Sequence, residues 1–193
     1  MGDDLPLLGE AFAVELANSD HRSGHEERDF LAAPDGVAAW FAHAPAAADL
    51  VVPAPLAPGV AAAVRGIRDA TRLLLTATTA ATDTDSADAR AAAAELLHQE
   101  ARRAAGHLAL DVGDAPAWRL HHEGDVDDVF RAAVACRAIL FLGGDDVRRV
   151  RSCARPTCPM LFVAQHKARR FCHDTCAHSV RQARYYRRHT SAT

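Results

Sequence analysis

Four cysteines near the C-terminus have a spacing that is typical of a metal site. Four residues separate Cys153 from Cys158, three separate Cys172 from Cys176, and thirteen lie between the two pairs. Two close pairs divided by a hairpin-length interval can gather four thiolates around one tetrahedral ion, and four protein ligands leave no open coordination position. The spacing predicts one structural Zn2+ ion. Disulfides or unrelated buried thiols are the alternative interpretation.

The residues between and after these pairs predict the elements that would hold them. Met160–Val163 is expected to form a strand, and residues 168–171 are expected to form its return strand. Cys172 and Cys176 are four residues apart, so they would share one face of the first turn of a helix. Such a treble-clef-like finger has too little apolar surface to fold without its metal. Three nearby histidines, any of which could replace one cysteine, are His166, His173 and His178.

The segment that follows the last cysteine is basic and has helical spacing. Arg181, Arg184 and Arg188 follow an i, i+3, i+7 pattern, which places them on one helical face. Cations held at fixed spacing on a helix suit the phosphates of a nucleic acid. The candidate nucleic-acid-binding residues are Lys167, Arg169, Arg170, Arg181, Arg184, Tyr185, Arg187 and Arg188.

Charge is distributed unevenly along the chain. Residues 147–193 carry eleven Lys or Arg and one acid, whereas residues 1–146 carry eleven Lys or Arg and 24 acids. The net charge of −3 therefore combines about +10 in the C-terminal part with about −13 in the rest. Such asymmetry favours a polyanion-binding end. A solvated basic tail that docks on its own acidic domain is the alternative.

The N-terminal part is expected to be mostly helical. Apolar periodicity and capping residues predict helices within 34–41, from Pro58, from Ser86 to Gly106 and from Asp125 to Gly143. The segment 8–17 is apolar and ends at a turn-forming cluster. Strands at 107–112 and 117–122 would form a hairpin, with a loop at 21–28 and a helix break at 82–85. The expected fold class is α+β: a mostly helical N-terminal domain with a small β-hairpin (1–144), followed by the treble-clef-like zinc finger (145–193).

These motifs resemble a bacterial family, the CGNR-type zinc-finger proteins with an N-terminal ABATE domain. The specific matches are Arg149–Cys153, Cys158–Val163, Arg169–Cys172, Cys176 and Arg184–Arg188, with a diffuse upstream match at Phe12–Ser19 and Phe30–Phe41. The Gly-Asn-Arg that names the family after the last cysteine is here Ala177-His178-Ser179. The resemblance implies an α+β fold, a stress-induced transcription regulator and an N-terminal domain that senses a ligand.

Three functions are weighed on this basis. The first is a zinc-finger, DNA-binding transcription regulator with a sensory N-terminal domain, in which Asn18 and Trp40 are the residues to watch for a ligand pocket, although a structural role is favoured for both. The others are an adaptor whose basic helix binds an acidic protein, and an RNA-binding protein. A homodimer stays open.

The sequence favours neither an enzyme nor a membrane protein. No acid–base pair shows a nucleophile–base arrangement, and the glycines form no phosphate-binding motif. No apolar run is long enough to span a bilayer, and the acidic N-terminus does not resemble a secretory signal. A cytoplasmic protein without catalytic activity is therefore expected.

Overall fold

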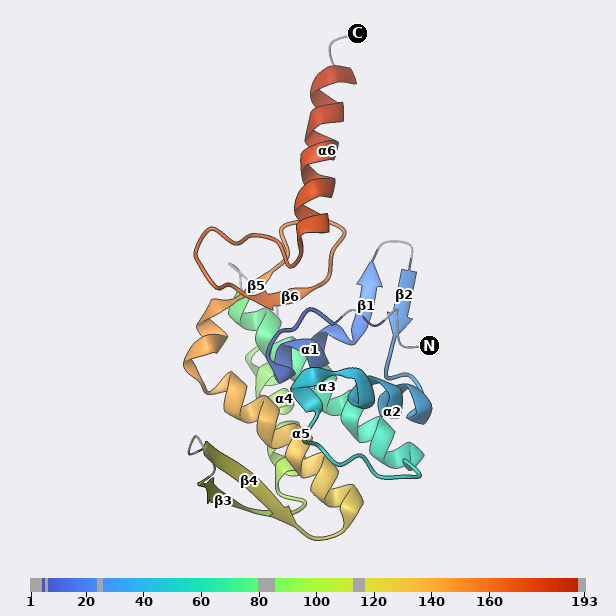
Figure 1. Ribbon diagram of the computed structural model, residues 1–193, viewed down its shortest axis with the longest axis vertical. Helices are drawn as coiled ribbons and strands as arrows, with labels where there is room; N and C mark the ends of the chain where they lie inside the picture. Colours follow the sequence, from blue (N-terminus) through green and yellow to red (C-terminus); the bar gives the residue numbers. More distant parts are fainter. Residues whose placement is uncertain (1–4, 6, 24–25, 80–85, 113–116, 191–193) are drawn as a thin grey trace.

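A computed structural model describes residues 5, 7–23, 26–79, 86–112 and 117–190 of the chain. Its helical N-terminal body contains α1 (Phe12–Asn18), β1 (Asp20–Ser23), β2 (Glu26–Asp29), α2 (Pro34–His43), the 3-10 turn η1 (Pro45–Ala47), α3 (Pro58–Thr79), α4 (Ala87–Ala101), β3 (Ala105–Asp111), β4 (Ala117–Glu123) and α5 (Val126–Leu142). The C-terminal part contains the 3-10 turn η2 (Asp145–Arg149), β5 (Val150–Ser152), β6 (Leu161–Val163) and α6 (Asp174–Thr190). The predicted α+β class is confirmed (Figure 1).

The main core lies where α1, α2, α3 and α5 meet. Every residue of the short helix α1 is buried, so tertiary packing rather than helix propensity holds it. Aromatic rings fill the centre: Phe41 contacts Trp40 and Phe130 edge to face, with ring centroids 4.9 Å apart in each pair. This apolar centre fixes the ends of α1 and α5, which carry the residues that meet the finger.

Local capping signals locate the starts of α4 and α5. The Ser86 hydroxyl accepts a hydrogen bond from the Ala89 amide at 3.0 Å and so begins α4. The Asp125 carboxylate accepts from the Asp127 amide at 2.9 Å and so begins α5, which ends at Gly143 as predicted. Helix α4 stops at Ala101, before the expected end at Gly106, because the chain already enters β3 at Ala105. The predicted helix break at 82–85 lies outside the described residues.

In the part of the chain that the structure describes, the strands form three two-stranded antiparallel sheets. The predicted hairpin is confirmed as β3–β4, in which Leu108 pairs with Leu120. The segment 21–28, expected to be a loop, instead contributes to the β1–β2 ribbon, in which Asp20 pairs with Asp29. The segment lacks the apolar alternation by which a strand is recognised, so its sequence did not predict the ribbon.

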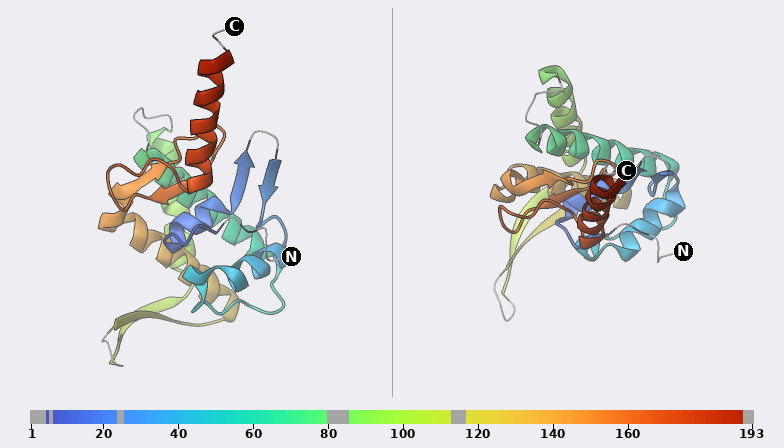
Figure 2. Two further views of the ribbon diagram at one scale, coloured as in Figure 1. Left: turned by 45° about the horizontal axis from the view of Figure 1, so that its top comes forward. Right: turned by 90° about the horizontal axis from the view of Figure 1, so that it is seen from above.

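Two elements project from opposite ends of the molecule. Helix α6 extends along the long axis beyond the body, and the β3–β4 hairpin extends at the other end (Figures 1 and 2). None of the helices in the described ranges combines the length and apolar character that a bilayer span requires.

Candidate metal centre and nucleic-acid interface

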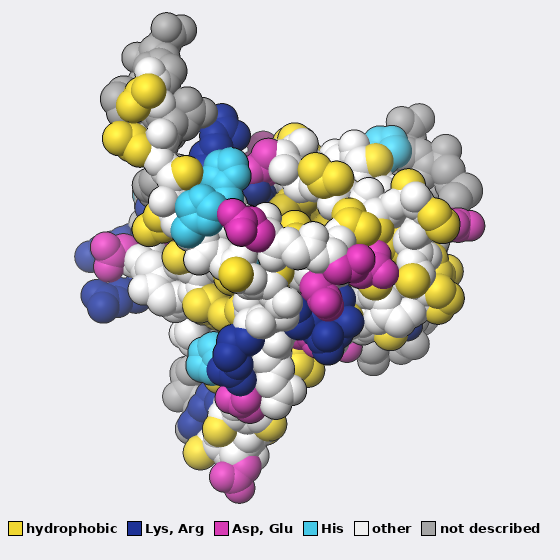
Figure 3. Space-filling view, turned by 90° about the horizontal axis from the view of Figure 1, so that it is seen from below, with side chains coloured by type: hydrophobic (Ala, Val, Ile, Leu, Met, Phe, Trp, Pro, Cys, Tyr) yellow, Lys and Arg dark blue, Asp and Glu magenta, His cyan; other side chains and the backbone are white. Residues whose placement is uncertain are grey.

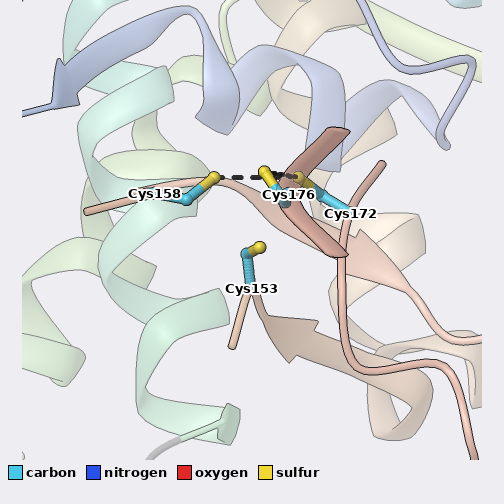
Figure 4. Close-up of side chains that lie close together, drawn as sticks. All are labelled: Cys153, Cys158, Cys172 and Cys176. Atoms are coloured by element: carbon cyan, nitrogen blue, oxygen red, sulfur yellow. Dashed lines mark hydrogen bonds between the residues drawn. The ribbon is translucent and has the colours of Figure 1, made fainter. Parts of the chain in front are cut away.

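The four cysteines come together at the base of α6. The Sγ atoms of Cys153, Cys158, Cys172 and Cys176 all lie within 4.8 Å of one another (Figure 4). Two of the separations, Cys158 to Cys172 and Cys172 to Cys176, are 3.7 Å. Tetrahedral zinc with Zn–S bonds of about 2.3 Å requires Sγ separations of about 3.8 Å. The cluster therefore fits one structural zinc ion.

The ligand set is four cysteines, without a histidine. The three histidines considered as alternatives, His166, His173 and His178, are all exposed, and none belongs to the cluster found among the described residues. The fifth cysteine, Cys136, lies apart in α5. Four thiolates complete a tetrahedral shell, so the ion would be structural, with no open position for water.

Close packing of the thiols shifts the pKa values of three of them in different directions. The neighbouring Cys172 thiol lowers the pKa of Cys158 to about 5 by hydrogen bonding. The same contact, together with burial, raises the pKa of Cys172, and burial raises the pKa of Cys176. Cys172 and Cys176 must therefore lose their protons when the metal binds, so metal binding is expected to depend on pH.

The strand that pairs with Leu161–Val163 in the finger is not the one predicted from the sequence. Leu161–Val163 forms β6 as predicted, but its partner is β5, which precedes Cys153. Residues 168–171 form no strand, so the predicted return strand is wrong. Side chains already occupy the other edge of β6, and no third strand can pair there. Helix α6 also begins at Asp174, so its first turn carries Cys176, whereas Cys172 precedes it.

Side chains of the N-terminal body and of the finger itself bind the whole outer edge of β6. The Asn18 side chain donates to the Leu161 carbonyl and accepts from the Leu161 amide, both at 2.9 Å. The Glu10 carboxylate accepts from the Val163 amide at 2.9 Å, and the Arg169 guanidinium donates to the Val163 carbonyl at 3.0 Å. All four outward backbone groups of Leu161 and Val163 are therefore satisfied.

An apolar cluster reinforces this junction between the body and the finger. Val14 and Ala17 of α1 and Leu75 of α3 pack with Val150 and Leu161 of the finger hairpin. All five are buried. The junction thus combines a dry apolar contact with the hydrogen bonds of the β6 edge, and it fixes the metal centre on the N-terminal body.

Asn18 and Trp40 lie in structural positions rather than in a ligand pocket. Asn18 is completely buried, and both polar atoms of its amide are used by Leu161. Trp40 is also completely buried and packs against Phe12 and Phe41 in the main core. The structural role favoured for both residues accounts for their contacts, and the ligand-binding alternative has no support from the structure.

Arg169 differs from the rest of the predicted nucleic-acid-binding set, because its guanidinium is bound within the protein and its side chain is 25% exposed. Its guanidinium forms an ion pair with Glu10 at 3.0 Å and donates to the Cys172 carbonyl at 2.8 Å. It also lies over the ring of Phe162, 4.6 Å from the centroid. These contacts hold Arg169 inside the finger, where it ties the metal loop to the body.

The other predicted basic residues lie on exposed surface. The exposed members of the set are Lys167, Arg170, Arg181, Arg184, Tyr185, Arg187 and Arg188. Every residue from Arg181 to His189 is exposed, and the Tyr185 ring is 59% exposed and stacks on His189. Cations in the last turn complement the negative end of the helix dipole, and this stabilises the helical conformation of α6 where it extends beyond the core.

Comparison with protein-family models matches nearly the whole chain. The ABATE model, described as "Putative stress-induced transcription regulator", covers residues 10–145, and the CGNR zinc finger model covers residues 149–189. The chain belongs to the ABATE family. A search of curated proteins returned no match. Membership and the CGNR zinc finger support a role in transcription regulation.

The boundary between the two family matches falls at η2, close to the predicted boundary between 1–144 and 145–193. In this ABATE protein the two parts share the apolar junction described above. At the positions of the family's Gly-Asn-Arg, Ala177 and Ser179 are half-buried in α6, and the Ser179 hydroxyl donates to the Thr175 carbonyl at 2.9 Å. The substitution is thus accommodated within the helix.

Proposed function

We propose that this protein is a cytoplasmic transcription regulator that binds DNA through α6 and senses a small molecule through its N-terminal body. The observation that carries the DNA-binding part is the exposed segment Arg181–His189 of α6, which carries four arginines and has its base at the metal centre. A helix that is polar on all sides gains little by packing on its own core. Its exposed cations suit a polyanionic partner.

The finger would hold the start of α6 in a fixed position relative to the body. Zinc fixes the start of α6 through Cys176, and the β6 edge fixes the finger on the body. Arginines held at i, i+3 and i+7 then meet successive phosphates without a large ordering cost. No catalytic role is assigned to the chain.

Salt dependence of DNA binding tests this function. We expect the zinc-loaded full-length protein to bind a random-sequence duplex with an affinity that falls steeply as the NaCl concentration rises. In a plot of the logarithm of the association constant against the logarithm of the salt concentration, each neutralised phosphate contributes a slope of about −0.9. The double variant R184Q/R188Q should lose about two units of that slope. A flat salt dependence of the unmodified protein would overturn the proposal.

A matched control removes the same charge from the body. The variant R90Q/R102Q lowers the net charge equally on and just after α4, and it should keep the slope of the unmodified protein. Equal loss in both double variants would mean that net charge, rather than α6, governs binding. Preference for single-stranded RNA, or tight binding of an acidic protein without nucleic acid, would favour the other two functions.

A further inference from the structure

Strand β3 forms the outer edge of the hairpin arm that projects from the N-terminal body. It pairs with β4 over seven residues, from Ala105 opposite Glu123 to Asp111 opposite Ala117. Helix α5 packs against β4, and within the described ranges no strand pairs with the other side of β3. An antiparallel strand turns every second N–H and carbonyl away from its partner. The outer edge of β3 therefore offers backbone groups to a further strand.

The sequence of β3 lacks the features that usually prevent an edge strand from pairing. Charged side chains and prolines are common means of keeping an edge from recruiting other chains. In the β1–β2 ribbon, six of the eight residues are charged by sequence, and the outer edge of β6 is bound by side chains. Strand β3 contains one aspartate and no lysine, arginine, glutamate or proline. Its edge is therefore suited to pairing.

One face of the hairpin exposes leucine side chains. Leu108 and Leu110 are 68% and 69% exposed and share a face by the alternation of the strand. Leu120 of β4 pairs with Leu108 and lies on the same face. Figure 3 shows hydrophobic side chains along the projecting arm in the view from below. A two-stranded ribbon is marginally stable alone, and further strands with a shared apolar face stabilise it. The exposed leucines thus favour the addition of strands.

The sequence of β3 is complementary to itself when two copies run antiparallel with Ala109 at the centre. In this register Leu108 of each copy comes opposite Leu110 of the other, which forms two leucine pairs on one face. On the other face, His107 comes opposite Asp111, so each acidic residue meets an imidazole rather than a second acid. A shift by one residue would align the apolar face of one copy with the polar face of the other. The sequence therefore favours a single register.

We infer that β3 pairs with β3 of a second copy of this protein, so that two hairpins form one four-stranded antiparallel sheet. The contact is the same on both copies and is related by a two-fold axis, so the assembly closes as a dimer. The occupant is a second copy because the leucine pairs and the histidine–aspartate pairs all arise from one sequence matched to itself. The inference goes beyond the proposed function, since this pairing requires neither DNA nor a small molecule.

Sedimentation velocity of the zinc-loaded full-length protein over a series of concentrations measures the dimer. We expect L108K/L110K to weaken dimerisation at least tenfold, because every introduced lysine comes opposite a lysine of the other copy. The control V51K/L140K adds the same charge at two apolar residues outside the hairpin, which are 77% and 49% exposed, and it should change the affinity less than twofold. An unmodified protein that stays monomeric at every concentration, or equal weakening by both double variants, would overturn the inference.

Exchange of two residues tests the register. His107→Asp places acidic residues opposite one another at two positions of the paired strands, and we expect it to weaken dimerisation at least fourfold. The exchanged variant H107D/D111H has the composition of the unmodified protein and restores both histidine–aspartate pairs, so its affinity should return to within twofold of the original. If the exchanged variant dimerised no better than the single variant, the antiparallel pairing centred on Ala109 would be wrong.

Cross-linking in a Cys136→Ser background locates the two-fold axis and covers the case in which the lysine variant does not fold. A short bis-maleimide should link Ala109→Cys rapidly, because residues directly opposite have Cβ atoms about 5 Å apart. In the matched control Ala105→Cys, eight strand positions separate the residue from its own copy, roughly 26 Å at about 3.3 Å per residue, and no linkage above background is expected. Linkage of both cysteines at equal rates, or of neither, would overturn the inference. No DNA is present, so failure here and failure of DNA binding are separate results.

Discussion

At the scale of single residues, Asn18 connects segments that lie 143 positions apart in the chain. A primary amide carries a donor and an acceptor side by side, as a strand residue does, so it can pair with one residue of a strand edge. Asn18 uses both groups on Leu161, in a fully buried setting. Removing the Asn18 side-chain amide would leave the backbone N–H and carbonyl of Leu161 without partners.

We therefore expect Asn18→Ala to lower the free energy of unfolding by about 2–4 kcal/mol, since each buried backbone group left without a partner costs roughly 1–3 kcal/mol. Urea unfolding of the zinc-loaded protein measures this loss. Gln99→Ala is the matched control, because the Gln99 amide forms an exposed hydrogen bond with Glu95. It should change stability by less than about 0.5 kcal/mol. Similar losses in both variants would contradict the role assigned to Asn18.

The same residues show what the sequence could and could not predict. The metal ligands were predictable because their spacing is local and thiolates in close pairs have few other uses. The partners of Asn18 and Arg169 were not, since both bind groups that come near only after the chain has folded. Arg169 resembles its exposed neighbour Arg170 in sequence, and only the contacts made in the folded chain, such as the ion pair with Glu10, distinguish the two.

At the scale of elements, helices with strong capping signals were predicted well, and short strands less so. Ser86 and Asp125 begin α4 and α5 where expected, because an N-cap is a property of a few adjacent residues. The return strand at 168–171 was wrong because the outer edge of β6 is bound by side chains of the body. Whether a strand edge can pair depends on side chains far away in the sequence that bind the same backbone groups, and a local sequence pattern does not predict those contacts.

An ion pair that is largely shielded from water links α4 to α5. Glu100 and Arg131 form two hydrogen bonds, of 2.7 and 2.8 Å, and their side chains are 12% and 17% exposed. Burial alone would raise the pKa of Glu100, but the hydrogen bonds from Arg131 and Arg103 outweigh it, so the pKa is lowered. The pair therefore stabilises the folded state only while Glu100 is ionised.

The sign of the pH dependence follows from this lowered pKa. Stabilisation by Glu100 is present above the unfolded-state pKa of about 4.3 and is lost as pH falls through the folded-state pKa. We expect Glu100→Gln to destabilise the protein by about 1–3 kcal/mol at pH 7, with a difference from the unmodified protein that shrinks below about pH 4. Urea unfolding at several pH values measures it.

Glu95→Gln supplies the control on the same helix. Glu95 pairs with Arg102 on open surface, where water screens the interaction, so its loss should have a much smaller effect at every pH. If the two glutamine variants behaved alike, burial of the Glu100 pair would not be the cause of its contribution.

At the scale of the whole molecule, the body and the metal centre have separate apolar cores. The main core contains residues of the N-terminal body only, whereas the cluster around the ligands contains Cys153, Met160 and Phe162 with Leu8 alone from the body. The junction cluster is small by comparison. Loss of the metal should therefore affect the finger without unfolding the main core.

Removal of zinc tests this division. We expect chelation to unfold the finger, so that trypsin cleaves after the arginines between residues 165 and 189 within minutes, much faster than in the zinc-loaded protein. Helices α1 to α5 should stay protected, as mass spectrometry of the fragments would reveal. Cys172→Ser should lose stoichiometric zinc, and Cys136→Ser, which alters the cysteine outside the cluster, should retain one ion per chain. Retention of zinc by the Cys172 variant, or unfolding of the whole chain on chelation, would contradict the independence of the main core from the metal centre.

The bound outer edge of β6 also limits how copies of this protein can associate. Strand edges with open amide and carbonyl groups recruit strands from other molecules, and this is a common route to self-association and aggregation. On β6 those groups are already taken by Asn18, Glu10 and Arg169. Any pairing between copies that kept the finger folded would therefore have to use a surface other than this edge.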